Sequence, residues 1–329
     1  MRAQTVQCML CPKQCKIPEG RSGDCRIRIN IGGKLKAVTF GFPVAVHVDP
    51  VEKKPFFHYF PSTPILSVAT VGCNMHCKNC QNWEISQANP EDQEAYDLPP
   101  KALVQAALSR NIPLIAYTYT EPIVYYEYTY ESALLGKQQG LRSAIVSAGY
   151  ANPEPMRALF KVVEAATIDV KCFDEQFYRD ICDGGLKPVL NTLVIAKEEN
   201  AWLEVSNLVI PTLSDDRQKI AMLVRWVKHN LGDETPLHFL RFVPHHKLKN
   251  LPPTPVETLE DAWKLALDAG MKYVYIGNVP GHEAENTRCP SCGKVVIGRV
   301  GYRITEMHLK KNLCEFCGAK IAGVFRGAT

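Results

Sequence analysis

The distribution of cysteines constrains this chain more than any other feature of its sequence. All but two of the thirteen cysteines fall into three compact groups. The groups are Cys8, Cys11, Cys15 and Cys25; Cys73, Cys77 and Cys80; and Cys289, Cys292, Cys314 and Cys317, with Cys172 and Cys182 left over as buried thiols. Grouped cysteines are metal ligands in a reducing compartment and disulfide partners in an oxidising one. The compartment therefore decides how the groups are interpreted.

The hydropathy of the chain predicts a cytoplasmic protein. No apolar run follows the first residues, MRAQTVQCMLCPKQ, as a secretory signal would require. No window approaches the roughly 18 consecutive apolar residues of a membrane span, so we expect no membrane association. The three cysteine groups are then three metal sites. A net charge of +4 permits an acidic partner but does not by itself indicate nucleic acid, so that question stays open.

Short β-branched runs alternate with longer helical stretches from about residue 65 to 281, which is the pattern of repeated βα units and a parallel sheet. The expected strands are 66–70, 114–119, 143–147, 167–171, 203–210, 237–242 and 273–276. The expected helices include 99–110, 215–231 and 254–269, and the last begins with a capping box from Thr254 to Glu257 or with Pro255 in its first turn. We therefore predict an α/β fold with a partial (β/α)6 TIM-like barrel at 61–284. Small cysteine-rich metal-binding segments at 1–60 and 285–329 flank it.

Polar and reactive residues follow the predicted strands at their carboxyl ends. GCNMHCKNC comes after the first strand and TEP after the second, followed by SAGYANP from Ser147, DVKCFD from Asp169 and RFVPHH from Arg241. In a βα barrel these ends meet at one mouth, where the active site lies. The pattern predicts an enzyme, and a barrel of six or seven strands would leave one side open for a large substrate.

Cys73-x3-Cys77-x2-Cys80 supplies three thiolates from one short loop. Thiolates hold iron–sulfur clusters, and three protein ligands on a cluster of four irons leave one iron open. Structural zinc takes four protein ligands, so a zinc knuckle that includes His76 is the alternative. The strand before the loop and the barrel pattern after it favour a [4Fe–4S] cluster.

This loop, placed after a strand, resembles the cluster loop of the radical S-adenosylmethionine (SAM) superfamily. The resemblance implies that the amino and carboxylate groups of SAM bind the open iron. An electron passed through the cluster then yields methionine and a 5′-deoxyadenosyl radical, which abstracts hydrogen from a substrate. An electron donor such as ferredoxin or flavodoxin is implied as a partner.

The resemblance also implies SAM-binding residues. The superfamily has Gly-Gly-Glu after the second strand, where this chain has Tyr119-Thr120-Glu121. Glu121 is then the partner of the SAM ammonium, and Thr120 offers a backbone contact. Bulk at Tyr119 and Thr120 departs from the glycines, which let a ligand approach the backbone.

A second motif, Asp169-x-Lys171, is similar to one in pyruvate formate-lyase activating enzymes. It implies Lys171 for the SAM carboxylate and Asp169 for the ribose or a cation, with a buried ion pair as the alternative. Ser147 stands where relatives have Thr-Asn-Gly. Relatives carry an aromatic residue before the third cysteine, where this chain has Asn79, and Trp83 is a candidate to replace it.

A closer resemblance extends over nearly the whole chain. CQNWEIS after the loop, TYTEP, YVYIGNVPGHEAENTRCPSCG and the N-terminal CxLCPxxC are similar to the radical SAM member of the AmmeMemoRadiSam system. The resemblance implies association with Memo-like and Ammecr-like proteins, and no particular substrate.

The two outer cysteine groups predict two further metal sites. Cys289-x2-Cys292-Gly and Cys314-x2-Cys317-Gly form paired knuckles typical of a four-sulfur tetrahedral site, and we favour a zinc ribbon over a rubredoxin-like iron site. The basic residues between them, Arg299 among them, are expected to be solvated. At Cys8, Cys11, Cys15 and Cys25 the spacing departs from the ferredoxin run, so zinc and an auxiliary iron–sulfur cluster both stay open, with zinc slightly ahead.

Two classes of function follow. The first is a hydrogen-abstracting radical SAM enzyme, acting on a partner protein to form a glycyl radical or on a small molecule or RNA. The second is a non-enzymatic multi-zinc protein that binds RNA or protein. The second leaves the polar strand ends unexplained, so the first is preferred.

Overall fold

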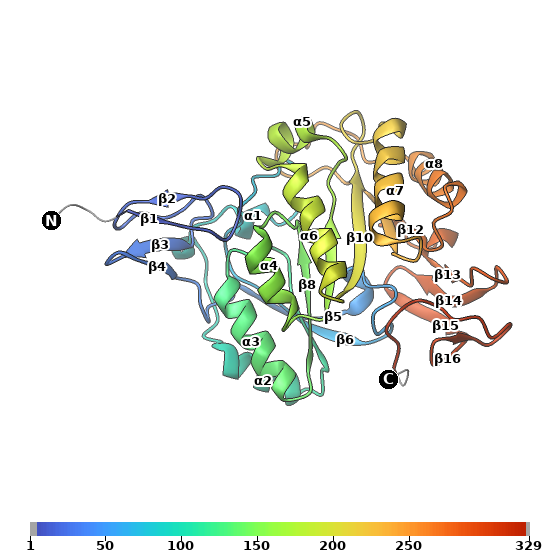
Figure 1. Cartoon of the computed structure of the whole chain (residues 1–329), viewed down its shortest axis with the longest axis horizontal. Coiled ribbons are helices and arrows are strands. Elements are labelled where there is room, and N and C mark those ends of the chain that lie inside the picture. The colour runs from blue at the N-terminus through green and yellow to red at the C-terminus, as the bar shows by residue number, and fades with distance from the viewer. Residues whose placement is uncertain (1–4, 327–329) are drawn as a thin grey trace.

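An eight-stranded sheet forms the centre of the protein in a computed structural model that describes residues 5–326 (Figure 1). In spatial order from one edge, the strands are β12 (Val274–Gly277), β11 (Leu237–Arg241), β10 (Trp202–Val209), β9 (Ala165–Asp169), β8 (Arg142–Ser147), β7 (Leu114–Tyr117), β6 (Pro64–Ala69) and β5 (Ala45–Pro50). Strands β6 to β12 are parallel, and β5 pairs antiparallel with β6. All seven strands predicted for the barrel are therefore present. Within the described residues no pairing joins β12 to β5, so the sheet is open.

Helices follow the strands and give six βα units before the last strand. They are α2 (Pro100–Leu108), α3 (Tyr126–Gln138), α4 (Pro153–Phe160), α6 (Leu186–Glu198), α7 (Arg217–Leu231) and α8 (Val256–Asp268), with the short α1 (Trp83–Ser86) and α5 (Glu175–Phe177) in connecting loops. In Figure 1 the long helices lie along the outer face of the sheet. The α/β fold with a partial (β/α)6 barrel is confirmed, and β12 adds a seventh parallel strand to it.

The N-termini of the predicted helices α7 and α8 differ in whether a side chain caps them. Asp216 caps α7, since its carboxylate accepts hydrogen bonds from the backbone amides of Gln218 and Lys219. The capping box predicted for α8 is wrong, because Pro255 is the N-cap and no side chain caps that end. Thr254 is fully buried instead, and its hydroxyl donates to the carbonyl of Val209. The Thr254 hydroxyl therefore makes a tertiary hydrogen bond in place of the helix cap that the sequence pattern predicted.

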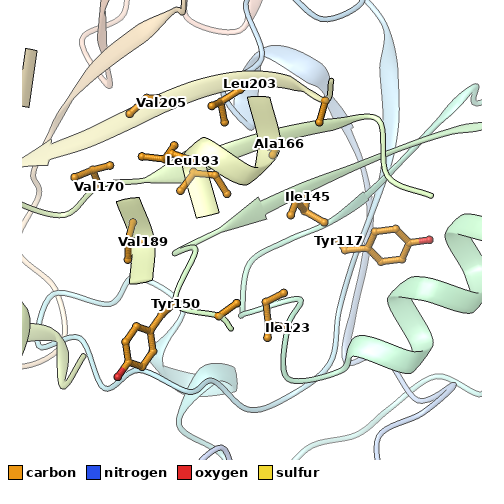
Figure 2. Packing of buried hydrophobic residues seen from close by; sticks show 14 of the residues in the cluster. Tyr117, Ile123, Ile145, Tyr150, Ala166, Val170, Val189, Leu193, Leu203 and Val205 are labelled. Atoms are coloured by element: carbon orange, nitrogen blue, oxygen red, sulfur yellow. The ribbon is translucent and has the colours of Figure 1, made fainter. Parts of the chain in front are cut away.

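Continuous burial explains the central strands. Five of the six residues of β6 are buried, as both faces of a parallel strand in this position should be. Figure 2 shows Val189 and Leu193 of α6 packed near Leu203 and Val205 of β10 and near Val170, which follows β9. Burying each such side chain is worth about 1.5–3 kcal/mol. This packing fixes the strand ends that carry the site.

Small antiparallel pairs stand at the two ends of the molecule. The N-terminal segment holds β1 (Val6–Gln7) with β2 (Lys16–Ile17), and β3 (Arg28–Ile31) with β4 (Lys34–Ala37). The C-terminal segment holds β13 (Thr287–Arg288), β14 (Val295–Val300), β15 (Arg303–Met307), β16 (Leu309–Lys310) and β17 (Leu313–Cys314). Figure 1 shows the two segments at opposite ends of the sheet. The division at 60 and 284 stays a prediction, and β5 joins the sheet from within residues 1–60.

The C-terminal segment is joined to the sheet through a buried arginine. Arg299 is only 2% exposed, so its expected place on a solvated face is wrong. Its guanidinium donates to the carbonyl oxygen of Phe57 and to the Thr287 hydroxyl, and lies 4.1 Å from the Phe57 ring centroid. These bonds make burial of the charge tolerable. No helix of the described chain combines the length and apolar character that crossing a membrane requires.

Candidate functional site

A cleft lies where the carboxyl ends of strands β6 to β11 meet, with a volume of about 1560 Å³ that includes its open mouth. Its walls come from the loops after these strands, which include the cysteine loop, the Thr118–Glu121 turn and the ends of β8 and β9. Residues as distant in sequence as Cys73 and Leu240 line this one cleft, and spacing along the chain alone could not place them together. The parallel order of the strands brings them to one edge.

The cysteine loop presents Cys73, Cys77 and Cys80 to this cleft. The backbone amides of His76 and Lys78 donate to the carbonyl oxygens of Cys182 and Ile181, both at 2.9 Å. Those carbonyls belong to a π-helical turn, Tyr178–Cys182. The loop is therefore held by the backbone of a distant segment as well as by its own strand.

The spacing of the three loop sulfurs differs from that of a single-ion site. Across residues 5–326, three or more ligand atoms lie within 4.8 Å of one another at Cys289, Cys292, Cys314 and Cys317, and at Asp24, His76 and Asp183, but not at the three loop cysteines. Around one tetrahedral zinc, sulfurs about 2.3 Å from the metal stand ~3.8 Å apart. Each thiolate on a cubane binds a different iron, so its ligands are further apart. The loop fits a cluster better than a zinc knuckle.

Cys182 lies next to the cysteine loop, although the sequence pattern placed it outside the three cysteine groups. Its thiol is fully buried and lies against that of Cys77. That contact comes first among the causes that lower the pKa of Cys77, ahead of burial, which raises it. No sequence signal marks this contact, because it depends on the π-helical turn folding back onto the loop.

Glu121 and Ser147 form one hydrogen-bonded unit at the cleft. The Ser147 hydroxyl donates to one carboxylate oxygen of Glu121 at 2.7 Å, and the Ala148 amide donates to the other at 2.9 Å. Glu121 is 2% exposed, and burial raises its pKa against the lowering effect of these donors. Glu121 and Ser147, which the resemblance implied separately, are thus in direct contact. Ser147 helps to fix the orientation of the Glu121 carboxylate, a hydrogen-bond acceptor in the cleft.

The turn before Glu121 has the backbone that a glycine would adopt. Tyr119 has a φ of +61°, in the left-handed region, and its carbonyl accepts a hydrogen bond from the Asn82 side chain at 2.7 Å. Its ring faces Lys54, whose ammonium lies 4.6 Å from the ring centroid. The Thr120 hydroxyl donates to the carbonyl of Thr70. The chain therefore reaches a glycine-like turn without glycine.

Asp169 and Lys171 both line the cleft and form an ion pair, with 2.5 Å between Lys171 Nζ and Asp169 Oδ2. The Ser206 hydroxyl also donates to Asp169. Burial disfavours the charge on Lys171, but the Asp169 carboxylate and the negative charge of a Cys77 thiolate outweigh it and raise the pKa of the lysine. Asp169 and Lys171 form an ion pair and also face the cleft, so the ion pair does not conflict with a role of these residues in binding SAM.

Asn79 and Trp83 have different surroundings. Asn79 lines the cleft, and its Oδ1 is buried without a hydrogen-bond partner among the described residues. Trp83 is not among the residues that line the cleft; it is 38% exposed and its ring stacks on that of His246. An aromatic role for Trp83 inside the cleft has no support in this arrangement.

Two residues at the rim of the cleft, Lys54 and Tyr302, were not predicted from the sequence. Lys54 is buried beside Asp49, 2.6 Å between Nζ and Oδ2, and burial lowers the pKa of Lys54 to about 8 although Asp49 acts to raise it. Tyr302, from the turn between β14 and β15, reaches the rim from the C-terminal segment. Neither position carries a motif, and both are brought to the cleft by the packing of the two end segments on the sheet.

The outer cysteine groups are separate from the cleft. In the C-terminal segment, Cys289 and Cys317 have their sulfurs 3.6 Å apart, and Cys292 and Cys314 have theirs 3.8 Å apart, which are tetrahedral single-ion distances. The N-terminal group lines a cavity of its own.

Comparisons with known proteins agree with this geometry. Residues 67–224 match the family model of the Radical SAM superfamily. An uncharacterised protein of Methanocaldococcus jannaschii is 44% identical over 318 residues, which are 96% of this chain and 95% of that protein. A pyruvate formate-lyase-activating enzyme of Clostridium pasteurianum is 23% identical over 179 residues, covering 54% of this chain and 73% of that enzyme. The structure of Streptococcus suis SuiB bound to S-adenosylmethionine matches with a TM-score of 0.51 at 9% identity, covering 69% of this chain and 53% of that one. This last likeness concerns the fold alone.

Proposed function

The chain belongs to the radical SAM superfamily, and on that premise we propose that it cleaves SAM reductively and abstracts hydrogen from a substrate held in the cleft. The observation that carries the proposal is the meeting of the three loop thiols with Glu121 and Lys171 on one cleft. The donor set is suited to a [4Fe–4S] cluster, which would supply one electron to SAM and an open iron for SAM to bind.

The residues of the chain would divide the binding of SAM among them. The carboxylate of Glu121, held by Ser147, is an acceptor for an ammonium group. The ammonium of Lys171 is a donor for a carboxylate, and Asp169 keeps it charged. Thr120, next to Glu121 in the glycine-like turn, also lines the cleft and is a further contact for a ligand. Asn79, with an unpartnered Oδ1, is a further acceptor in the same cleft.

The substrate is a partner protein that receives a glycyl radical, or a small molecule or RNA. Similarity to an activating enzyme supports the first, and a donor such as ferredoxin or flavodoxin would supply the electron. Memo-like and Ammecr-like proteins are the candidate partners. Mixing the reduced enzyme with SAM and each candidate, and recording the electron-spin spectrum, tests for a glycyl signal; its absence with every candidate argues for the small-molecule or RNA class.

The SAM chemistry is tested by one pair of variants. Cys77→Ala removes a loop thiol, whereas Cys172→Ala removes a buried thiol that lies outside all three groups and does not line the cleft. After anaerobic loading with iron and sulfide, we expect wild type and Cys172→Ala to release 5′-deoxyadenosine from SAM with a reductant, and Cys77→Ala to release none. Full release by Cys77→Ala would refute the proposal. A colourless, zinc-only wild-type protein would favour the non-enzymatic binding protein.

A further inference from the structure

The four N-terminal cysteines surround a cavity that is separate from the cleft. Cys8, Cys11, Cys15 and Cys25 all line it, and its volume is about 340 Å³ with its opening included. Three of the four are buried, and Cys15 is half-buried. Hairpin β1–β2 holds Cys8 near Cys15, because the amide of Cys8 donates to the carbonyl of Cys15 at 2.9 Å. Four thiols around one hollow are a complete donor set for a metal centre.

The sulfur spacing decides what kind of metal centre fits. No three of these four sulfurs lie within 4.8 Å of one another, although every residue concerned is described. The C-terminal four do, at the ~3.8 Å separation that one tetrahedral zinc requires. The C-terminal group therefore shows the sulfur–sulfur separations of a single-ion site in this same chain, and the sulfurs of the N-terminal group are further apart than that. Wider sulfurs around an internal hollow suit a cluster of several irons bridged by sulfide.

The wall of the cavity also favours an anionic occupant. Arg28 lines it, is 4% exposed, and has an Nε without a hydrogen-bond partner, while its other nitrogens bind Glu127. A buried donor without a partner is costly, and an anion in the cavity would satisfy it. Lys13 lines the cavity as well and pairs with Asp24. Charge alone does not separate zinc from a cluster, because both are anionic with four thiolates, but it supports occupation.

The cavity shares a wall with the cluster loop. Asn74, which follows Cys73 directly, lines the N-terminal cavity together with Cys11, and its side-chain amide donates to the carbonyl oxygen of Tyr150. On the other side of Cys73, a Cβ on Gly72 would lie 2.6 Å from the carbonyl oxygen of Cys25. The two cysteine groups are therefore in contact through Gly72–Asn74.

From these four observations we infer that Cys8, Cys11, Cys15 and Cys25 hold a second iron–sulfur cluster, of the [4Fe–4S] class, next to the cluster loop. Its position suits a one-electron carrier between a low-potential donor protein at the surface and the cleft. Each electron taken from the donor is passed on singly, and no bond is made or broken at this site.

The test leaves the N-terminal group intact. In the triple variant Cys73→Ala/Cys77→Ala/Cys80→Ala, loaded anaerobically with iron and sulfide, we expect about four irons and four sulfides per chain, against about eight of each in wild type. The reduced triple variant should give the electron-spin and Mössbauer spectra of a cubane. About one zinc per chain belongs to the C-terminal site in both proteins. A triple variant without sulfide, holding about two zincs, would overturn the inference.

The reciprocal variant is Cys8→Ala/Cys11→Ala, which should lose about half the iron and sulfide and keep the loop cluster. The control Cys172→Ala should match wild type. Full wild-type iron in the reciprocal variant would overturn the inference. If the reciprocal variant does not fold, the iron and sulfide content of the triple variant decides the question alone, because that variant retains all four N-terminal cysteines.

Discussion

Glu121 shows how strongly this site depends on single side chains. Its carboxylate receives hydrogen bonds from Ser147 and Ala148 and is placed in a cleft where an ammonium group can approach. Glu121→Gln keeps the shape and removes the charge. We expect SAM to bind the iron-loaded variant about tenfold to a hundredfold more weakly, the equivalent of one charge-assisted hydrogen bond. Equilibrium binding of SAM measures the effect.

The matched control for Glu121→Gln is Glu131→Gln, on the exposed face of α3. It should leave SAM binding unchanged. Iron content should be the same in both variants, since neither residue is a ligand. Equal SAM affinity in wild type and Glu121→Gln would remove Glu121 from the binding role.

Cys182 offers a second test at the scale of one residue. Its buried thiol lies against that of Cys77, where it is placed to donate to the ligand sulfur, and hydrogen bonds to ligand sulfurs raise the reduction potential of a cluster. Cys182→Ala should keep the iron and lower the midpoint potential by roughly 60 mV, which for one electron is about 1.4 kcal/mol. Potentiometric titration with Cys172→Ala as control measures it. Loss of iron instead would make Cys182 a ligand.

Single residues also show which parts of the site can be predicted from the sequence. The cysteine groups could be predicted because the spacing of ligands along a loop or knuckle is a local pattern. Lys54, Tyr302 and Cys182 carry no local pattern, and only the packing of distant segments brings them to the site. Thr254 illustrates the opposite error, since a local capping pattern was present and a tertiary hydrogen bond took precedence.

At the scale of elements, the predicted strands were correct because fully buried parallel strands are short apolar runs bounded by turns. The attachment of the N-terminal segment was not predictable, since it depends on close approach between two backbones. Gly72 is at that contact with a φ of +95°, and an added Cβ would meet the Cys25 carbonyl at 2.6 Å and Ile27 Cγ2 at 2.7 Å.

Gly72→Ala should destabilise this attachment. The left-handed backbone costs about 1 kcal/mol for alanine, and the overlap adds roughly 2 kcal/mol. Gly140→Ala is the control, because Gly140 also has a positive φ, +80°, with no atom within 4 Å of its added Cβ. Thermal unfolding of both variants separates the two costs. Equal losses of melting temperature would mean that the Gly72 contact does not matter for stability.

At the scale of the whole molecule, His58 joins the segment before β6 to the C-terminal segment. It is fully buried, with Nδ1 donating to the Ala322 carbonyl at 2.6 Å and Nε2 accepting from the Tyr275 hydroxyl at 2.5 Å. Burial lowers the pKa of His58 to about 4, more than nearby Glu204 raises it. Between pH 6.5, the ordinary pKa of histidine, and pH 4, His58 is protonated in the unfolded chain but neutral in the folded chain.

Stability should therefore fall as the pH falls from 6.5 to 4, and His58 should account for roughly 3 kcal/mol of that fall. Denaturant unfolding across this range should show a flatter pH dependence for His58→Gln than for wild type. His229→Gln, on the exposed end of α7, should show the wild-type slope. An unchanged slope in His58→Gln would mean that His58 is already charged in the folded protein.

The proposed activity of the whole molecule depends on SAM binding an open iron beside the loop cysteines. The most direct measurement is pulsed electron-spin spectroscopy on the reduced protein with SAM labelled with ¹⁵N at its amino group. We predict a hyperfine coupling between that nitrogen and the cluster in wild type and in Cys172→Ala. An iron-loaded, reduced protein that shows no coupling to the label would contradict the central claim.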